Sequence, residues 1–81
     1  MNDEQLLQRI VLNPNVMLGK PVIKGTRLTV EHIIDRMAHE ATTADLIEEY
    51  DGLAPDDILA CLLFARKSLS ETDYMPLAEA S

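Results

Sequence analysis

Residues 10–28 contain the feature that most restricts the fold, because prolines and glycines interrupt the chain there every few positions. Pro14 and Pro21 lack a backbone N–H, and Gly19 and Gly25 favour turns, so no continuous helix fits this stretch. The pieces between them, IVL, VML and PVI, are rich in residues that favour strands. We therefore predict two or three short extended segments that form a β-hairpin arm.

The rest of the chain has the periodicity of helices. Apolar residues recur at spacings of three and four in four stretches, which predict helices over residues 1–9, 29–41, 43–50 and 55–69. Thr29 and Thr42 suit N-caps, whereas Ala54 is a poor cap for the helix that Pro55 begins. The predicted fold is mainly α: a small trihelical, helix-turn-helix-like domain over residues 1–69 with a short N-terminal β-hairpin arm. A flexible acidic tail follows over residues 70–81.

The last predicted helix is apolar around nearly its whole circumference, in the run ILACLLFA. Such a helix has to be covered on more than one side, which is difficult for a domain of 81 residues. We expect a homodimer through this face, and the alternative is that the N-terminal arm folds over it within one chain. The residues expected in the core or at the dimer contact are Val22, Ile23, Ile58, Cys61, Leu62, Leu63 and Phe64.

Charge is distributed unevenly along the chain, whose formal net charge is −7. Residues 14–30 carry three cations and no acid, whereas residues 31–81 carry twelve carboxylates against three cations. The acidic total disfavours nonspecific attraction to nucleic acid or anionic membranes. The basic strip suits either of two roles: a structural turn and strand element, or contact with phosphates. Under the second role, the nucleic-acid contacts are Lys20, Lys24, Thr26 and Arg27.

The residues that could carry catalysis or bind a metal are poorly arranged for either. His32 and His39 lie seven positions apart, without the i, i+4 spacing of a helical zinc site. The adjacent acids at 48–49 and 56–57 diverge by about 100° on a helix, so we expect a solvated acidic face. Cys61, in an apolar run, is expected to be a buried, reduced thiol. We expect no enzymatic activity, no catalytic residue, no metal and no cofactor.

The same features indicate where the protein works. The longest unbroken apolar run, residues 58–65, is far shorter than the roughly 20 residues of a membrane span. A single cysteine cannot form a disulfide within the chain, which fits a reducing compartment. We expect a cytoplasmic protein without a membrane partner.

A series of short motifs, from about Ile10 to Ala65, is similar to a known family. The motifs are NP at 13–14, GKPVI at 19–23, GTR at 25–27 and Val30, then Tyr50 with Leu53, Asp57-Ile58 and Phe64-Ala65. They resemble the bacterial and archaeal domain of unknown function 433. The resemblance implies a helix-turn-helix-like fold with a β-hairpin arm. It also implies the role of antitoxin in a type II toxin–antitoxin module whose toxin is a PIN-like ribonuclease.

Three positions depart from the pattern of that family. Glu40 stands where the family often has glycine, Asp51 where proline is frequent, and Ala54 where threonine or serine commonly caps the last helix. These changes loosen turns and helix ends without altering the signature motifs. They also make the domain more acidic.

Three hypotheses follow for function. The first is an antitoxin-like binding protein that engages a basic ribonuclease, with apolar anchors in the tail at Tyr74, Met75 and Leu77. The second is a DNA-binding regulator that contacts operator DNA through residues 19–27. The third is a structural dimerisation module, in which the GKPVIKGTR segment joins two copies.

Overall fold

The computed structural model describes residues 1–70, so the proposed tail anchors Tyr74, Met75 and Leu77 lie outside the described residues. Within that range the protein is mainly helical with a two-stranded antiparallel sheet, and the predicted fold class is confirmed. The helices are α1 (Asp3–Leu7), α2 (Val30–Ala38), α3 (Thr43–Glu49) and α4 (Pro55–Ser70), and the strands are β1 (Ile10–Val11) and β2 (Val22–Ile23).

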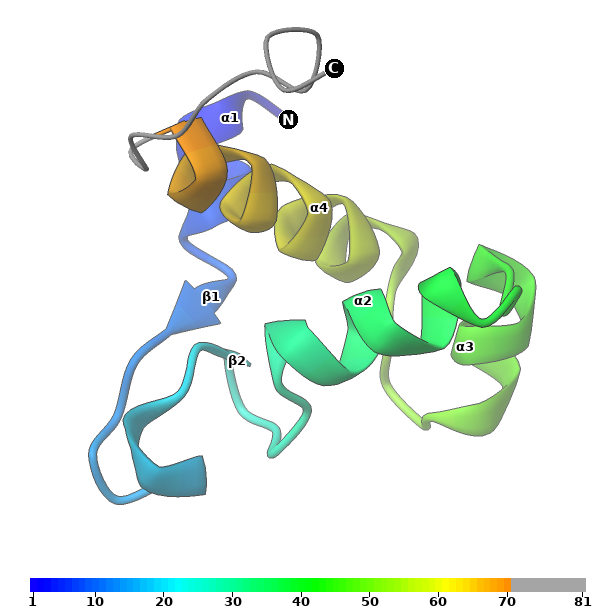
Figure 1. The fold of residues 1–81 in the computed structure, drawn as a ribbon, viewed down its shortest axis with the longest axis horizontal. Helices are drawn as coiled ribbons and strands as arrows, with labels where there is room; N and C mark the ends of the chain where they lie inside the picture. Colours follow the sequence, from blue (N-terminus) through cyan, green and yellow to red (C-terminus); the bar gives the residue numbers. More distant parts are fainter. Residues whose placement is uncertain (71–81) are drawn as a thin grey trace, which may run out of the picture.

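The hairpin arm has two short strands joined by a wide loop over residues 12–21 (Figure 1). Ile10 pairs with Ile23 and Val11 with Val22 in an antiparallel register. Two of the two or three predicted extended segments form strands, whereas the VML segment between them contributes to a 3-10 turn at Met17–Gly19. The Asn-Pro-Asn sequence before it already bends the chain, and the side chain of Asn13 accepts a hydrogen bond from the amide of Asn15 at 2.9 Å.

Local capping sets where three of the helices begin. At α1, the Asn2 side chain accepts from the Gln5 amide at 2.8 Å, and the Gln5 side chain accepts in return from the Asn2 amide at 3.0 Å. Thr29 caps α2 and Thr42 caps α3 through their hydroxyl oxygens, as the sequence predicted. The second helix ends at Ala38, short of the predicted residue 41, because the chain turns into a left-handed conformation two residues later.

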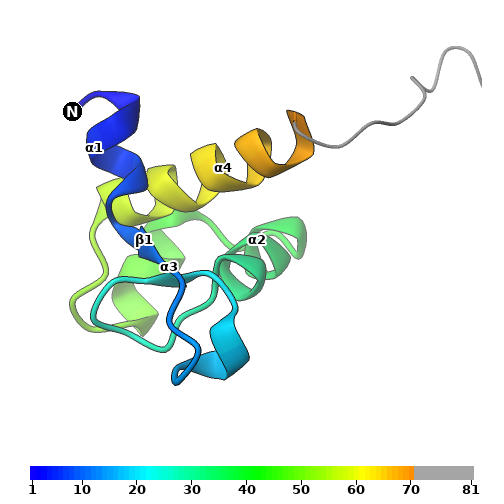
Figure 2. The same cartoon turned by 90° about the vertical axis from the view of Figure 1, so that its left-hand side faces the viewer.

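The core lies where α4 crosses α2 and meets the hairpin. Helix α1 packs along α4, which also contacts α2, α3 and β1 (Figures 1 and 2). The buried apolar residues are Ile10, Val22, Ile23, Val30, Ile33, Leu46, Leu53, Ile58, Ala60 and Cys61.

No helix among residues 1–70 is both long enough and apolar enough to span a bilayer.

Candidate functional site

The cations of the arm differ in their surroundings. The ammonium of Lys20 lies 3.1 Å from a carboxylate oxygen of Glu31 on α2, so its charge is already offset. Lys24 and Arg27 are exposed, and neither forms an ion pair within the part of the chain that the structure describes. Of the strip predicted from sequence, these two side chains are the ones available to a ligand.

Thr26 has a structural part in the turn between the cations. Its hydroxyl donates to the carbonyl of Ile23 at 2.8 Å and accepts from the amide of Leu28 at 3.0 Å. Gly25 precedes it with a φ of +81°, in the left-handed region that favours glycine. The side chain of Thr26 thus fixes the loop that carries Lys24 and Arg27, and both of its hydrogen-bonding roles are occupied.

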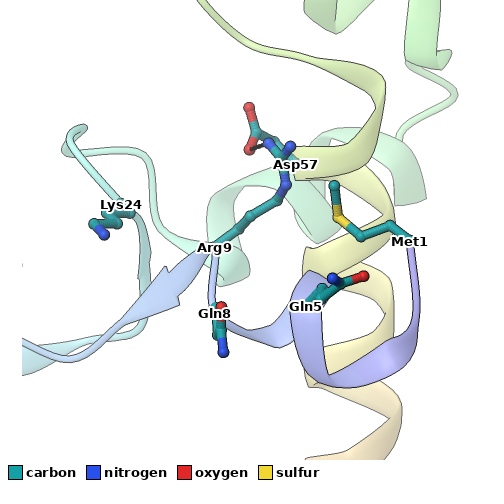
Figure 3. Close-up of a pocket in the computed structure, with 6 residues that line it drawn as sticks. All are labelled: Met1, Gln5, Gln8, Arg9, Lys24 and Asp57. Carbon is teal, nitrogen blue, oxygen red and sulfur yellow. Dashed lines mark hydrogen bonds and ion pairs between the residues drawn. The ribbon is translucent and has the colours of Figure 1, made fainter.

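An open depression of about 610 Å³ lies beside Lys24, between the N-terminal segment and the start of α4. Figure 3 shows Arg9 directed at Asp57, with Lys24 apart from this pair. Because Arg9 and Asp57 neutralise each other, Lys24 is the one charged lining side chain without an ion-pair partner among the described residues. The lining residues are Met1, Gln5, Gln8, Arg9, Lys24 and Asp57.

Asp57 is a buried carboxylate, and the expectation that it belongs to a solvated acidic face is wrong. It is only 7% exposed. One oxygen accepts from Arg9 Nη1 at 2.8 Å, and the other accepts from the amide of Ala54 at 2.9 Å. The neighbouring Asp56 is more exposed and lies 3.8 Å from Arg9 Nη2. Asp57 therefore joins the chain before β1 to the first turn of α4, which explains how a charge is accommodated in the interior.

A polar network ties α2 to α3. Arg36 forms a two-pronged ion pair with Glu49, one arm of which measures 2.9 Å, and also donates to the hydroxyl of Tyr50 at 3.2 Å. His32 Nε2 lies 2.8 Å from the same hydroxyl. The hydrogen bond from Arg36 holds the pKa of Glu49 below its ordinary value and raises the pKa of the guanidinium. Glu49, expected to be merely solvated, instead helps to fix the angle between the two helices.

Residues 40–51 form what we call the acidic end. This segment has five exposed carboxylates and no Lys, Arg or His. Figure 1 places α3, which carries much of it, at the far end of the molecule from the hairpin arm. Charge is thus segregated, with carboxylates at one end and the cations of the arm at the other. The five are Glu40, Asp45, Glu48, Glu49 and Asp51.

Several carboxylates of the acidic end are held in position. The amide and hydroxyl of Thr42 bond to Asp45, which lowers the pKa of that carboxyl. Arg36 offsets the charge of Glu49. Glu48 and Asp51 are exposed and have no ion-pair partner within residues 1–70. The acidic end therefore presents uncompensated charge at Glu48 on α3 and at Asp51 just after it.

The residues expected in the core or at a dimer contact fall into two groups. Val22, Ile23, Ile58 and Cys61 are buried within one chain, and Phe64 packs against the same core. Leu63 is half-buried, and Leu62 is exposed.

Cys61 in particular cannot form a surface contact, because none of it is exposed. Burial raises the pKa of its thiol to about 12, and the negative charge of Asp57 adds to the effect. The thiol is therefore protonated and shielded at neutral pH.

The prediction from sequence periodicity missed Leu59 and Leu69, which share the exposed side of α4 with Leu62.

The histidines and other metal-ligating side chains are scattered. No group of three His, Cys, Asp or Glu residues gathers into a possible metal site within residues 1–70. His32 is engaged with Tyr50, and its ring meets the tyrosine ring edge to face. His39 Nδ1 lies 2.7 Å from the carbonyl oxygen of Asp35 and 3.5 Å from its carboxylate.

These features define a small, mainly helical domain with a hairpin arm and segregated surface charge. The chain belongs to the family described as "Protein of unknown function (DUF433)", which matches over residues 10–65. It is also similar to the crystal structure of a DUF433 member protein from Anabaena variabilis ATCC 29413. The sequence identity is 26% and the TM-score is 0.73, over 84% of this chain and 68% of that one. No curated protein matches this chain.

Proposed function

We propose that this protein is a non-enzymatic, antitoxin-like binding protein that neutralises a PIN-like ribonuclease in a type II toxin–antitoxin module. The observation that supports this most directly is the acidic end, where exposed carboxylates gather without a Lys, Arg or His over residues 40–51. A ribonuclease has to attract RNA and therefore presents a positive surface near its active site. The acidic end is complementary to such a surface.

The rigidity of the acidic end strengthens the argument. Binding costs less when the contacting groups are already ordered, because fewer side chains and backbone segments lose freedom on association. The capping box at Thr42 and the Arg36–Glu49 pair fix α3 before any partner arrives. Charge complementarity of this kind chiefly increases the association rate and makes it sensitive to salt.

The experiment is coexpression with the product of the neighbouring reading frame. We expect a stable complex that copurifies and in which RNA cleavage by the partner is suppressed. Glu48→Lys and Asp51→Lys are expected to slow association about tenfold at low salt, and this difference is expected to shrink as salt is raised. Glu4→Lys on α1 makes the same charge change away from the acidic end and serves as the matched control.

Two outcomes would overturn the proposal. One is that no complex forms with the neighbouring gene product. The other is a complex whose association is slowed as much by Glu4→Lys as by the changes at positions 48 and 51. The second result would show that total charge, and not the acidic end, governs binding.

A second candidate function is DNA binding, and the exposed Lys24 and Arg27 favour it because no carboxylate among residues 1–70 neutralises them. Binding to the DNA upstream of the protein's own reading frame is expected to fall steeply with salt. Lys24→Ala and Arg27→Ala should each reduce the salt slope by about 1, whereas Lys67→Ala at the end of α4 should not. The absence of a mobility shift at low salt would remove this candidate.

A further inference from the structure

Helix α4 has two unlike sides. Its inner side contributes Ile58, Ala60 and Cys61 to the core. On the other side Leu59, Leu62 and Leu69 are 50%, 41% and 62% exposed. At about 100° per residue, positions 59, 62, 66 and 69 fall within a sector of about 80°. We call Leu59, Leu62, Arg66 and Leu69 the outer stripe of α4.

The outer stripe is not covered by the rest of the described chain. In Figure 2, α2 and α3 lie on one side of α4, α1 lies beside its beginning, and the later turns of α4 run along an edge of the domain. Helix α1 packs on a different side of α4, where Leu7 and Phe64 line the same small depression. Single exposed leucines are common on soluble proteins, but three aligned along one helix form an apolar stripe, interrupted by Arg66, of the kind that marks an interface.

The charges at the two ends of α4 indicate both the partner and its direction. The first turn carries Asp56, whose side chain is 44% exposed, and the last turns carry Arg66 and Lys67. When two copies of α4 pack antiparallel, the acidic end of each meets the basic end of the other. A parallel arrangement would place like charges together. The charges of the helix are therefore complementary to themselves in the antiparallel direction, and self-complementarity is what a two-fold symmetric contact requires.

We propose that the outer stripe is the contact surface of a homodimer in which two α4 helices pack antiparallel. In the register that best uses the stripe, Leu59 of one copy lies against the aliphatic part of Arg66 of the other, and Leu62 lies next to the two-fold axis. The guanidinium of Arg66 then reaches Asp56 of the second copy. Asp56 has room for this donor, because its contact with Arg9 is long, at 3.8 Å.

This interface is independent of the proposed ribonuclease binding, which uses the acidic end.

Each α4 extends over about 24 Å, given its 16 residues and a rise of 1.5 Å per residue. The outer stripe runs along most of that length. Such a contact would add apolar burial to a domain whose own core is small.

The first test is the solution mass of the full chain, measured by sedimentation equilibrium. We expect the mass of two chains for the wild type and of one chain for Leu62→Glu, with the same helical circular dichroism in both. Leu18→Glu is the matched control, since Leu18 is 94% exposed on the arm and should leave the dimer intact. A single-chain mass for the wild type at about 100 μM, or equal dissociation by Leu18→Glu, would overturn the proposal.

The second test addresses direction by charge exchange. Arg66→Glu places an acid opposite Asp56 of the second copy and is expected to raise the dimer dissociation constant about tenfold, since the repulsion occurs twice per dimer. The double variant Asp56→Arg with Arg66→Glu restores opposite charges only in the antiparallel arrangement. A double variant that dimerises no better than Arg66→Glu alone would refute it.

Discussion

Replacing Glu40 by glycine is expected to stabilise the domain by about 1 kcal/mol. Glu40 has a φ of +73°, which places a residue with a Cβ in the left-handed region. Two hydrogen bonds at the end of α2 impose this left-handed conformation. The amide of Glu40 donates to the carbonyl of Met37 at 3.1 Å, and the amide of Ala41 donates to the carbonyl of Arg36 at 3.0 Å. This pair of bonds is the Schellman motif, in which glycine is the usual residue at the position of Glu40.

The magnitude follows from three terms, two in favour of glycine and one against it. A residue with a side chain loses roughly 1–2 kcal/mol in the left-handed conformation, and glycine avoids that loss. Glycine also increases the conformational freedom of the unfolded chain, which costs about 0.5–1 kcal/mol. Removing a carboxylate from the negative end of α2 adds about 0.3 kcal/mol in favour of glycine. The balance favours the variant by about 1 kcal/mol, which corresponds to a rise of about 4–8 °C in Tm for a domain of this size.

The assay is urea unfolding followed by circular dichroism, with all variants at one protein concentration. Glu40→Ala removes the same carboxylate but keeps the Cβ, so the difference between Gly and Ala isolates the backbone term. Gly25→Ala is the reciprocal change, because Gly25 has a φ of +81° and an added Cβ would meet no atom within 4 Å. It should lose about 1 kcal/mol. Equal stability of Glu40→Gly and Glu40→Ala would refute the argument.

Three further changes are expected to alter stability. Ala54→Thr should add about 0.5 kcal/mol in thermal unfolding, because its hydroxyl can accept from the Asp57 amide, which otherwise donates to the carbonyl of residue 54 at 3.0 Å, and can so form a capping box with the bond from the residue 54 amide to Asp57; Ala54→Val, of similar shape, should not. Arg9→Met should cost about 2 kcal/mol in urea unfolding, because Asp57 is left buried without its cation, whereas Arg27→Met should change stability by less than about 0.5 kcal/mol. The pKa of Glu49 is lowered in the folded state, so the stability from its pair with Arg36 is present above its ordinary value of 4.5 and is lost as pH falls below it. Arg36→Met should therefore weaken the decline in stability below pH 4.5, and an unchanged acid profile would contradict this account.

The sequence predicted what depends on neighbouring residues. Thr29 and Thr42 each bond to an amide three residues later, so the start of α2 and of α3 can be predicted from a short stretch. The Pro and Gly residues of the arm likewise restrict the backbone at their own positions. The 3-10 turn at Met17–Gly19 was missed because its apolar residues also favour strands, and the turn bonds that decide the matter leave no periodic pattern.

Contacts between distant segments could not be predicted in the same way. Asp57 and Arg9 are 48 positions apart, and each looks like an ordinary surface charge in its own helix or loop. Arg36 has Glu40 one turn away, but it pairs with Glu49 on α3, where the Tyr50 hydroxyl accepts an additional hydrogen bond. The relative placement of the helices determines which charges pair, and the spacing of residues within one helix does not reveal that placement.

The apolar run of α4 shows how two expectations can apply to different sides of one helix. The run has no polar side to reveal its orientation, so a dimer contact and an intrachain cover were both consistent with it. In the structure, α1 packs along the side that includes Phe64, and the ion pair of Arg9 with Asp57 anchors the segment that follows α1. The family match begins at Ile10, so α1 and Arg9 lie outside it while Asp57 lies within it. Intrachain cover thus accounts for one side of α4, and the outer stripe is where the proposed second copy binds.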